Sequence, residues 1–140
     1  MDVLSLGRRH LAGMRAHVDS QAPLEACGLL AGTQGRVQAV LPVPNAAQSR
    51  TRFRMEPVGQ LKAFDWIDAN GMELLAIYHS HPAGPEAPSP TDIAEAAYDV
   101  IHIIWSRPDG TWRPRAFRIT GEEVREVQLQ VIDGPGQEYD

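Results

Sequence analysis

An apolar stretch that ends in two histidines constrains this chain more than any other feature. Residues 74–78 are apolar throughout, as expected of a central strand covered on both faces, and His79 and His81 belong to the end of that strand. Because residues i and i+2 of a strand point to the same side, the two imidazoles are predicted to project together. Leu75 and Ile77 are predicted to share their face. Two histidines at the rim of buried apolar material can hold one metal ion.

A third ligand is predicted eleven residues after His81. The sequence Ser89-Pro90-Thr91-Asp92 is typical of a helix start, with serine at the N-cap, proline at N1 and an acid at N3. A catalytic zinc ion usually has three protein ligands and one open position. Asp92 is the best candidate for the third ligand, because its helix follows directly on the proline-rich connection that leaves the histidines.

Each of these residues also has an ordinary structural explanation. Paired histidines at a strand end can be surface or core groups. Asp92 can be only the N3 acid of a capping box headed by Ser89. Glu25, which follows Pro23-Leu24, is on its own grounds interpreted as an exposed carboxylate in a loop or at a strand start. Ser80 is interpreted as a packing or hydrogen-bonding residue, because no base is arranged to activate it.

Composition limits the class of protein. A chain of 140 residues with 43% hydrophobic residues is expected to form one domain, over 1–132, with a loose tail at 133–140. The net charge of −5 argues against nucleic acid as the main partner. The single cysteine, Cys27, rules out an intrachain disulfide. No segment is typical of a signal peptide or a membrane span, so a cytoplasmic protein without a membrane partner is expected.

The pattern of elements is mixed. Hydrophobic spacing predicts helices over 8–20 and 57–70, and the second of these has an apolar stripe. A third helix is predicted to start at Ser89 and to be extended by Ala94, Ala96 and Ala97. Strands are predicted at 3–6 (an edge strand), 27–31, 36–43, 49–55, 74–78, 100–105, 112–120 and 124–132. Helices between strands and antiparallel hairpins predict an α/β domain of the α+β type.

The metal-binding pattern resembles a known family. His79-Ser80-His81-Pro82, six further residues and Ser89-Pro90-Thr91-Asp92 match without a gap the H-x-H-x7-S-x-x-D signature of the JAMM (MPN+/Mov34) zinc metalloproteases. The segment 24–32, with Glu25, is similar to the glutamate-bearing segment of that family, and Asn45 and Phe53 lie where its members often carry similar residues. The resemblance covers roughly residues 4–120. It implies the MPN fold, related to cytidine deaminases: a mixed, mostly antiparallel sheet flanked by helices.

The resemblance implies a role for each matching residue. His79, His81 and Asp92 would ligate Zn²⁺, with a water in the fourth position. Glu25 would be the general base, and Ser89 would donate a hydrogen bond to the developing oxyanion.

The resemblance also implies a reaction. The family hydrolyses the peptide or isopeptide bond after the C-terminal glycine of ubiquitin or ubiquitin-like proteins. This compact chain looks like the short prokaryotic members, some of which act on sulfur-carrier proteins. A homodimer is also expected by analogy, since family members often dimerise. Arg50, Arg52 and Arg54 are either a basic stripe for an acidic partner or a solvated strand face.

Two alternatives belong to other classes. A non-catalytic MPN scaffold would be a binding module, but such relatives lose metal ligands and every expected position is filled here. A cupin-type metalloprotein is suggested by His79, His81 and Glu86, which satisfy H-x-H-x4-E. A cupin is nearly all β and needs a further histidine in a later motif, and His102 lacks that context. His10, His17 and His102 are expected to be structural or exposed.

Overall fold

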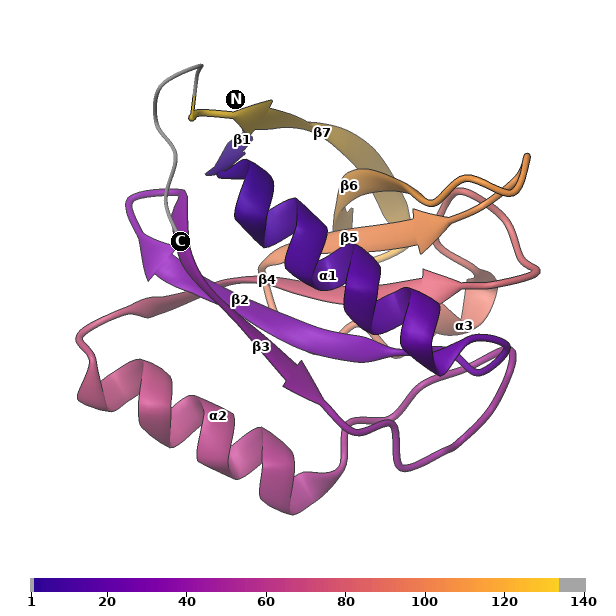
Figure 1. Cartoon of the computed structure of the whole chain (residues 1–140), viewed down its shortest axis with the longest axis horizontal. Helices are drawn as coiled ribbons and strands as arrows, with labels where there is room; N and C mark the ends of the chain where they lie inside the picture. Colours follow the sequence, from indigo (N-terminus) through magenta and orange to yellow (C-terminus); the bar gives the residue numbers. More distant parts are fainter. Residues whose placement is uncertain (1, 134–140) are drawn as a thin grey trace.

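The computed structural model describes residues 2–133 of the 140-residue chain (Figure 1). Seven strands and three helices follow one another in the order β1 (Val3–Leu6), α1 (Arg8–Gln21), β2 (Cys27–Thr33), β3 (Arg36–Val43), α2 (Pro57–Ala69), β4 (Glu73–His81), α3 (Pro90–Ala94), β5 (Ile101–Ser106), β6 (Arg113–Thr120) and β7 (Glu123–Val131). The predicted tail at 133–140 lies, apart from Asp133, outside the described residues. No helix within 2–133 is long and apolar enough to cross a membrane.

The strands form one closed sheet in the order β1-β3-β2-β4-β5-β6-β7. Strand β4 is central, antiparallel to β2 and parallel to β5. Both parallel and antiparallel pairs occur beside three helices, which confirms the mixed α+β class. The prediction that residues 3–6 form an edge strand is wrong, because β1 pairs in parallel with both β3 and β7 and thereby closes the ring.

Helices α1 and α2 cover opposite faces of the sheet around β2 and β4 (Figure 1). On one side, Met14 of α1 packs with Leu30 and Tyr78 in one core, the α1-side core. On the other side, Ile67 of α2 packs with Leu29 in a second core, the α2-side core. This coverage on both faces explains why β2 and β4 are continuously apolar rather than alternating.

A bulge in β4 changes which side chains share the face of the histidines. Leu30 of β2 lies opposite Ala76, but the next residue of β2 lies opposite Leu74, so Leu75 is an extra residue in the pairing. Leu74 and Ile77 pack with the α2-side core, whereas Leu75 packs with the α1-side core. The prediction that Leu75 shares the face of Ile77 is therefore wrong.

The predicted strand at 49–55 is absent, and this part of the chain is a loop. Its ends meet in an isolated bridge between Asn45 and Met55. The Asn45 side-chain oxygen accepts hydrogen bonds from the backbone N–H groups of Ala47 and Arg54, at 3.0 and 2.9 Å. These local bonds satisfy backbone donors that a strand would have given to a neighbour. The arginines of the predicted basic stripe, Arg50, Arg52 and Arg54, are exposed on the loop.

Helices α2 and α3 begin as predicted but differ in detail. The apolar stripe of α2 is covered only toward its end, since Ile67 is buried while Val58 and Leu61 are 57% and 61% exposed. Helix α3 ends at Ala94, so the prediction that Ala96 and Ala97 extend it is wrong. The segment after Ala94 turns away and contributes to a cavity beside the histidines.

Candidate metal centre

Three side-chain atoms converge at the C-terminal end of β4. The Nε2 atoms of His79 and His81 lie 3.0 Å apart. Oδ2 of Asp92, from the first turn of α3, lies 3.2 Å from the first of these nitrogens and 3.0 Å from the second. The result is a nearly equilateral triangle of two imidazole nitrogens and one carboxylate oxygen, all on residues with little solvent exposure.

The dimensions of this triangle match a metal site. Zinc–nitrogen and zinc–oxygen bonds of about 2.0–2.1 Å in a tetrahedron put neighbouring ligand atoms about 3.3 Å apart. Two imidazole nitrogens that point at each other across 3.0 Å need a proton or a cation between them. The donor set and its spacing therefore fit a metal ion that leaves one further position open.

The His81 ring is held by the loop that leaves β4. Its Nδ1 lies 2.8 Å from the backbone carbonyl oxygen of Pro85, which can only accept, so Nδ1 carries a proton and the ring aims Nε2 at the triangle. His79 is held differently, by Phe53 of the 44–56 loop, whose ring stacks on it at a centroid distance of 4.4 Å.

Asp92 is both the N3 acid of a capping box and a member of the triangle. The backbone N–H of Ser89 donates to Oδ2 of Asp92 at 2.8 Å, and the Asp92 N–H donates to the Ser89 hydroxyl oxygen at 3.1 Å. The capping explanation and the ligand explanation are thus compatible, because the cap aims the carboxylate. Although burial opposes ionisation, hydrogen bonds from His79 and His81 hold the pKa of Asp92 well below its usual range.

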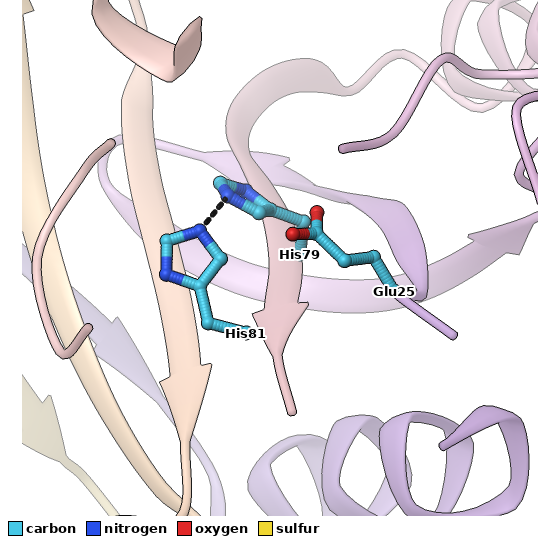
Figure 2. Close-up of side chains that lie close together, drawn as sticks. All are labelled: Glu25, His79 and His81. Atoms are coloured by element: carbon cyan, nitrogen blue, oxygen red, sulfur yellow. Dashed lines mark hydrogen bonds between the residues drawn. The ribbon is translucent and has the colours of Figure 1, made fainter. Parts of the chain in front are cut away.

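Glu25 lies beside the triangle and is only 3% exposed, which excludes the reading of an exposed loop carboxylate. One of its oxygens and one ring nitrogen each of His79 and His81 lie within 4.8 Å of one another (Figure 2). Its Oε1 atom is buried without a hydrogen-bond partner. Burial raises its pKa to about 8, and the positive charge of His81 opposes this only in part.

Glu25 and Asp92 therefore compete for the position of third ligand. One oxygen of the Glu25 carboxylate lies within 4.8 Å of a nitrogen of each histidine. Asp92, however, contacts both Nε2 atoms within 3.2 Å, whereas Oε1 of Glu25 bonds to nothing. The geometry thus favours Asp92 as the ligand and leaves Glu25 as a buried carboxyl group beside the triangle.

Two polar residues hold the backbone that carries Glu25. The Ser80 hydroxyl accepts a hydrogen bond from the Ala26 N–H at 2.8 Å, and the Ser80 N–H donates to the Ala26 carbonyl at 3.0 Å. Asn45 donates from Nδ2 to the Glu25 carbonyl oxygen at 3.0 Å. The interpretation of Ser80 as a hydrogen-bonding residue is confirmed. Its two bonds connect the Glu25 segment to β4, the strand that carries His79 and His81.

A cavity of about 290 Å³ opens beside the triangle. Its apolar wall includes Phe53, Met55 and Ile77, and His79 and His102 also line it. His102 is a neighbour of the metal centre that the sequence did not predict. His102 lies there because the register of β5 against β4 places it beside Ile77. That register cannot be read from the amino-acid sequence.

The structure removes the cupin alternative. Glu86 lies on the surface, where its carboxylate is 3.9 Å from Arg115 and takes no part in the triangle. The three helices and the parallel pair of β4 with β5 also disagree with an all-β fold.

Comparison with known proteins places the chain in a family. Residues 7–120 match the family of prokaryotic homologs of the JAB domain. A probable TtuB-protein conjugate cleaving protease of Thermus thermophilus is 43% identical, covering 93% of this chain and 84% of the relative. A desampylase of Haloferax volcanii is 33% identical, over 92% of this chain and 88% of the relative. A CysO-cysteine peptidase of Mycobacterium tuberculosis is also 33% identical, over 86% and 85%.

Solved structures show the same fold. A protein of Desulfitobacterium hafniense superimposes with a TM-score of 0.84 at 31% identity, covering 95% of both chains. A JAB1/MPN domain protein of Archaeoglobus fulgidus superimposes with a TM-score of 0.62 at 23% identity, covering 93% of this chain and all of the other. The match over residues 7–120 and the similarity to curated relatives along most of their length show that this chain belongs to the family of prokaryotic homologs of the JAB domain.

Proposed function

We propose that this protein is a zinc metallopeptidase that cleaves the peptide or isopeptide bond after the C-terminal glycine of a ubiquitin-like or sulfur-carrier protein. The observation that carries the proposal is the triangle of His79, His81 and Asp92 with the buried carboxyl group of Glu25 beside it. Relatives that are named for cleaving a TtuB–protein conjugate, for desampylation and for a CysO–cysteine peptidase activity support this substrate class.

Zinc is the metal that this donor set favours. Two neutral imidazoles and one carboxylate with an open position are typical of catalytic zinc. When bound, zinc supplies a Lewis acid that polarises a carbonyl group and lowers the pKa of a coordinated water to about 7.

Glu25 is proposed to move the proton. A carboxyl group with a pKa of about 8 is mostly neutral at pH 7 and cannot accept a proton. A cation in the neighbouring triangle would favour its ionised form, because opposite charges lower the pKa of an acid. Glu25 then takes a proton from the attacking water and returns it to the leaving amine.

Ser89 is proposed to assist at the carbonyl oxygen. Its hydroxyl oxygen already accepts the Asp92 N–H, so the hydroxyl proton is left to donate. A donor at the edge of the centre stabilises the negative charge that develops on the oxygen as the carbonyl is attacked.

The recessed position of the triangle supports a substrate with glycine before the cleaved bond. The side chains of His79 and His81 are 1% and 3% exposed, so the attacked carbonyl must reach well into the protein. A terminal glycine has no side chain to collide with the surrounding loops.

We also propose that residues 1–132 form one domain, that the enzyme is cytoplasmic, and that it acts as a homodimer.

Mass spectrometry of carrier fusions tests the proposal. A small protein that ends in Gly-Gly, extended by a peptide or joined to a lysine side chain, should be cut after its last glycine by the zinc-loaded enzyme and not after chelation. Glu25→Gln should bind zinc and leave the fusion intact. If the zinc-loaded wild type binds the carrier but never cuts any fusion, the scaffold alternative is correct instead.

A further inference from the structure

Two buried ring nitrogens beside the cavity have no hydrogen-bond partner. They are Nδ1 of His79 and Nε2 of His102, and within residues 2–133 the remaining buried side-chain atom of this kind is Oε1 of Glu25. Both histidines line the same cavity and are at most 6% exposed. A buried polar atom without a partner is costly, so such atoms indicate a missing interaction.

The two nitrogens have opposite hydrogen-bonding character. Nε2 of His79 faces the triangle, so a ring that gives this lone pair to a metal carries its proton on Nδ1 and is a donor there. A neutral His102 ring has one donor and one acceptor nitrogen, and its Nε2 is buried without a partner and so is free to be the acceptor. With its proton on Nδ1, this ring keeps a bare lone pair on Nε2.

The sheet brings these two rings to the same face. In the parallel pair of β4 and β5, Ile77 lies opposite His102 and His79 lies opposite Ile104. His79 and His102 are therefore diagonal neighbours, and such neighbours lie roughly 7 Å apart between Cα atoms, within reach of long and aromatic side chains.

The two histidines of the triangle differ in their support. Nδ1 of His81 is hydrogen-bonded to the carbonyl oxygen of Pro85, whereas Nδ1 of His79 has no hydrogen-bond partner. Metal-bound histidines almost always donate their second N–H to an acceptor, which fixes the ring and raises its basicity. We propose that His102 is a positioning residue that accepts the Nδ1 proton of His79, directly or through one water, and so holds His79 for the metal. This inference rests on the metal site of the proposed function.

Zinc affinity of two His102 variants tests this role. His102→Leu removes the acceptor, and the apparent dissociation constant for zinc, measured by competition with a chromogenic chelator, should rise about 10- to 100-fold. His102→Gln keeps an acceptor oxygen and should stay within about threefold of the wild type. Ile103→Val is the matched control, because Ile103 is on the same strand but packs in the α1-side core. It should leave zinc affinity unchanged.

The outcomes separate the two proposals. A wild type that binds no zinc contradicts the proposed function itself. A wild type that binds zinc, together with a folded His102→Leu variant of equal affinity, contradicts only the role of His102.

A measurement on the unaltered protein covers the case in which His102→Leu does not fold. Imidazole ¹⁵N spectra of the zinc-loaded wild type should show His102 protonated on Nδ1 and bare on Nε2, and His79 with a slowly exchanging Nδ1 proton. A proton on Nε2 of His102 would overturn the proposal.

Discussion

The side-chain amide of Asn45 donates a hydrogen bond to the backbone carbonyl of Glu25, with 3.0 Å between Nδ2 and the oxygen. The same side chain bonds the N–H groups of Ala47 and Arg54 and the carbonyl of Arg52, so its hydrogen-bonding capacity is full. The backbone N–H of Glu25 in turn donates to the 44–56 loop, at the carbonyl of Ser49, 2.8 Å away. The loop and the Glu25 segment are therefore one connected structure.

Asn45→Ala should reduce turnover much more than zinc affinity. Loss of the side chain removes its hydrogen bonds to the carbonyls of Glu25 and Arg52 and to two loop N–H groups, at a cost of about 1–3 kcal/mol in the free energy of unfolding. Hydrolysis of a carrier fusion, zinc competition and urea unfolding measure the three effects. Asn45→Asp keeps the acceptor and loses the donor, so its turnover should lie between that of Asn45→Ala and that of the wild type. Equal loss of zinc affinity and turnover would show that the loop supports the ligands rather than Glu25.

Glu25 should make the metal-free protein less stable as the pH rises. Its pKa is raised by burial from 4.5 to about 8 in the folded state, so the unfolded state loses its proton first. This contribution to stability is complete below pH 4.5 and is lost progressively between pH 4.5 and 8. At pH 7 Glu25→Gln should therefore stabilise the metal-free protein, by at most about 3 kcal/mol and by less where solvent screens the carboxylate.

Urea unfolding of the two chelated proteins at pH 4 and pH 7 measures this difference. The increase in the free energy of unfolding caused by Glu25→Gln should shrink toward zero at pH 4, because Glu25 is then protonated in both the folded and the unfolded wild type. A gain of the same size at both pH values would show that packing, not ionisation, is the cause.

Asp92→Ala should remove a zinc ligand and a helix cap together. Elemental analysis should find clearly less than one zinc ion per chain after dialysis, because two nitrogens hold the metal poorly without the carboxylate. The free energy of unfolding of the metal-free protein should fall by about 1 kcal/mol from loss of the capping box. Glu86→Ala is the control, since the surface carboxylate of Glu86 faces Arg115. Full zinc content in Asp92→Ala would exclude Asp92 as a ligand.

Gly28→Ala should destabilise the fold. A Cβ atom at Gly28 would overlap the ring of Tyr78, which is fully buried and bonded through its hydroxyl to Nδ1 of His17 at 2.7 Å. Overpacking of this kind costs about 1–3 kcal/mol, measurable as a lower midpoint of thermal unfolding. Gly13→Ala is the matched control, because nothing lies within 4 Å of a Cβ there and alanine is the better helix former. Its midpoint should rise.

Local patterns predicted much of the fold and the candidate site. The alternation of a strand explains why His79 and His81 project together, and the capping box that begins at Ser89 brings Asp92 back to the N-cap. Both are contacts between residues close in sequence. The predicted strand at 49–55 failed because the alternation there comes from arginines on a loop whose backbone is satisfied by Asn45.

The amino-acid sequence by itself determined the mixed class of fold, the strand that carries two histidines, and the helix start that carries Asp92. Only the tertiary structure decided that β1 closes the sheet, that a bulge moves Leu75 to the other core, and that Glu25 is buried beside the histidines. It also decided that His102 faces the cavity. The reason is physical: periodicity and capping act over a few residues, whereas strand register and the burial of a carboxyl group depend on segments that lie far apart in the sequence.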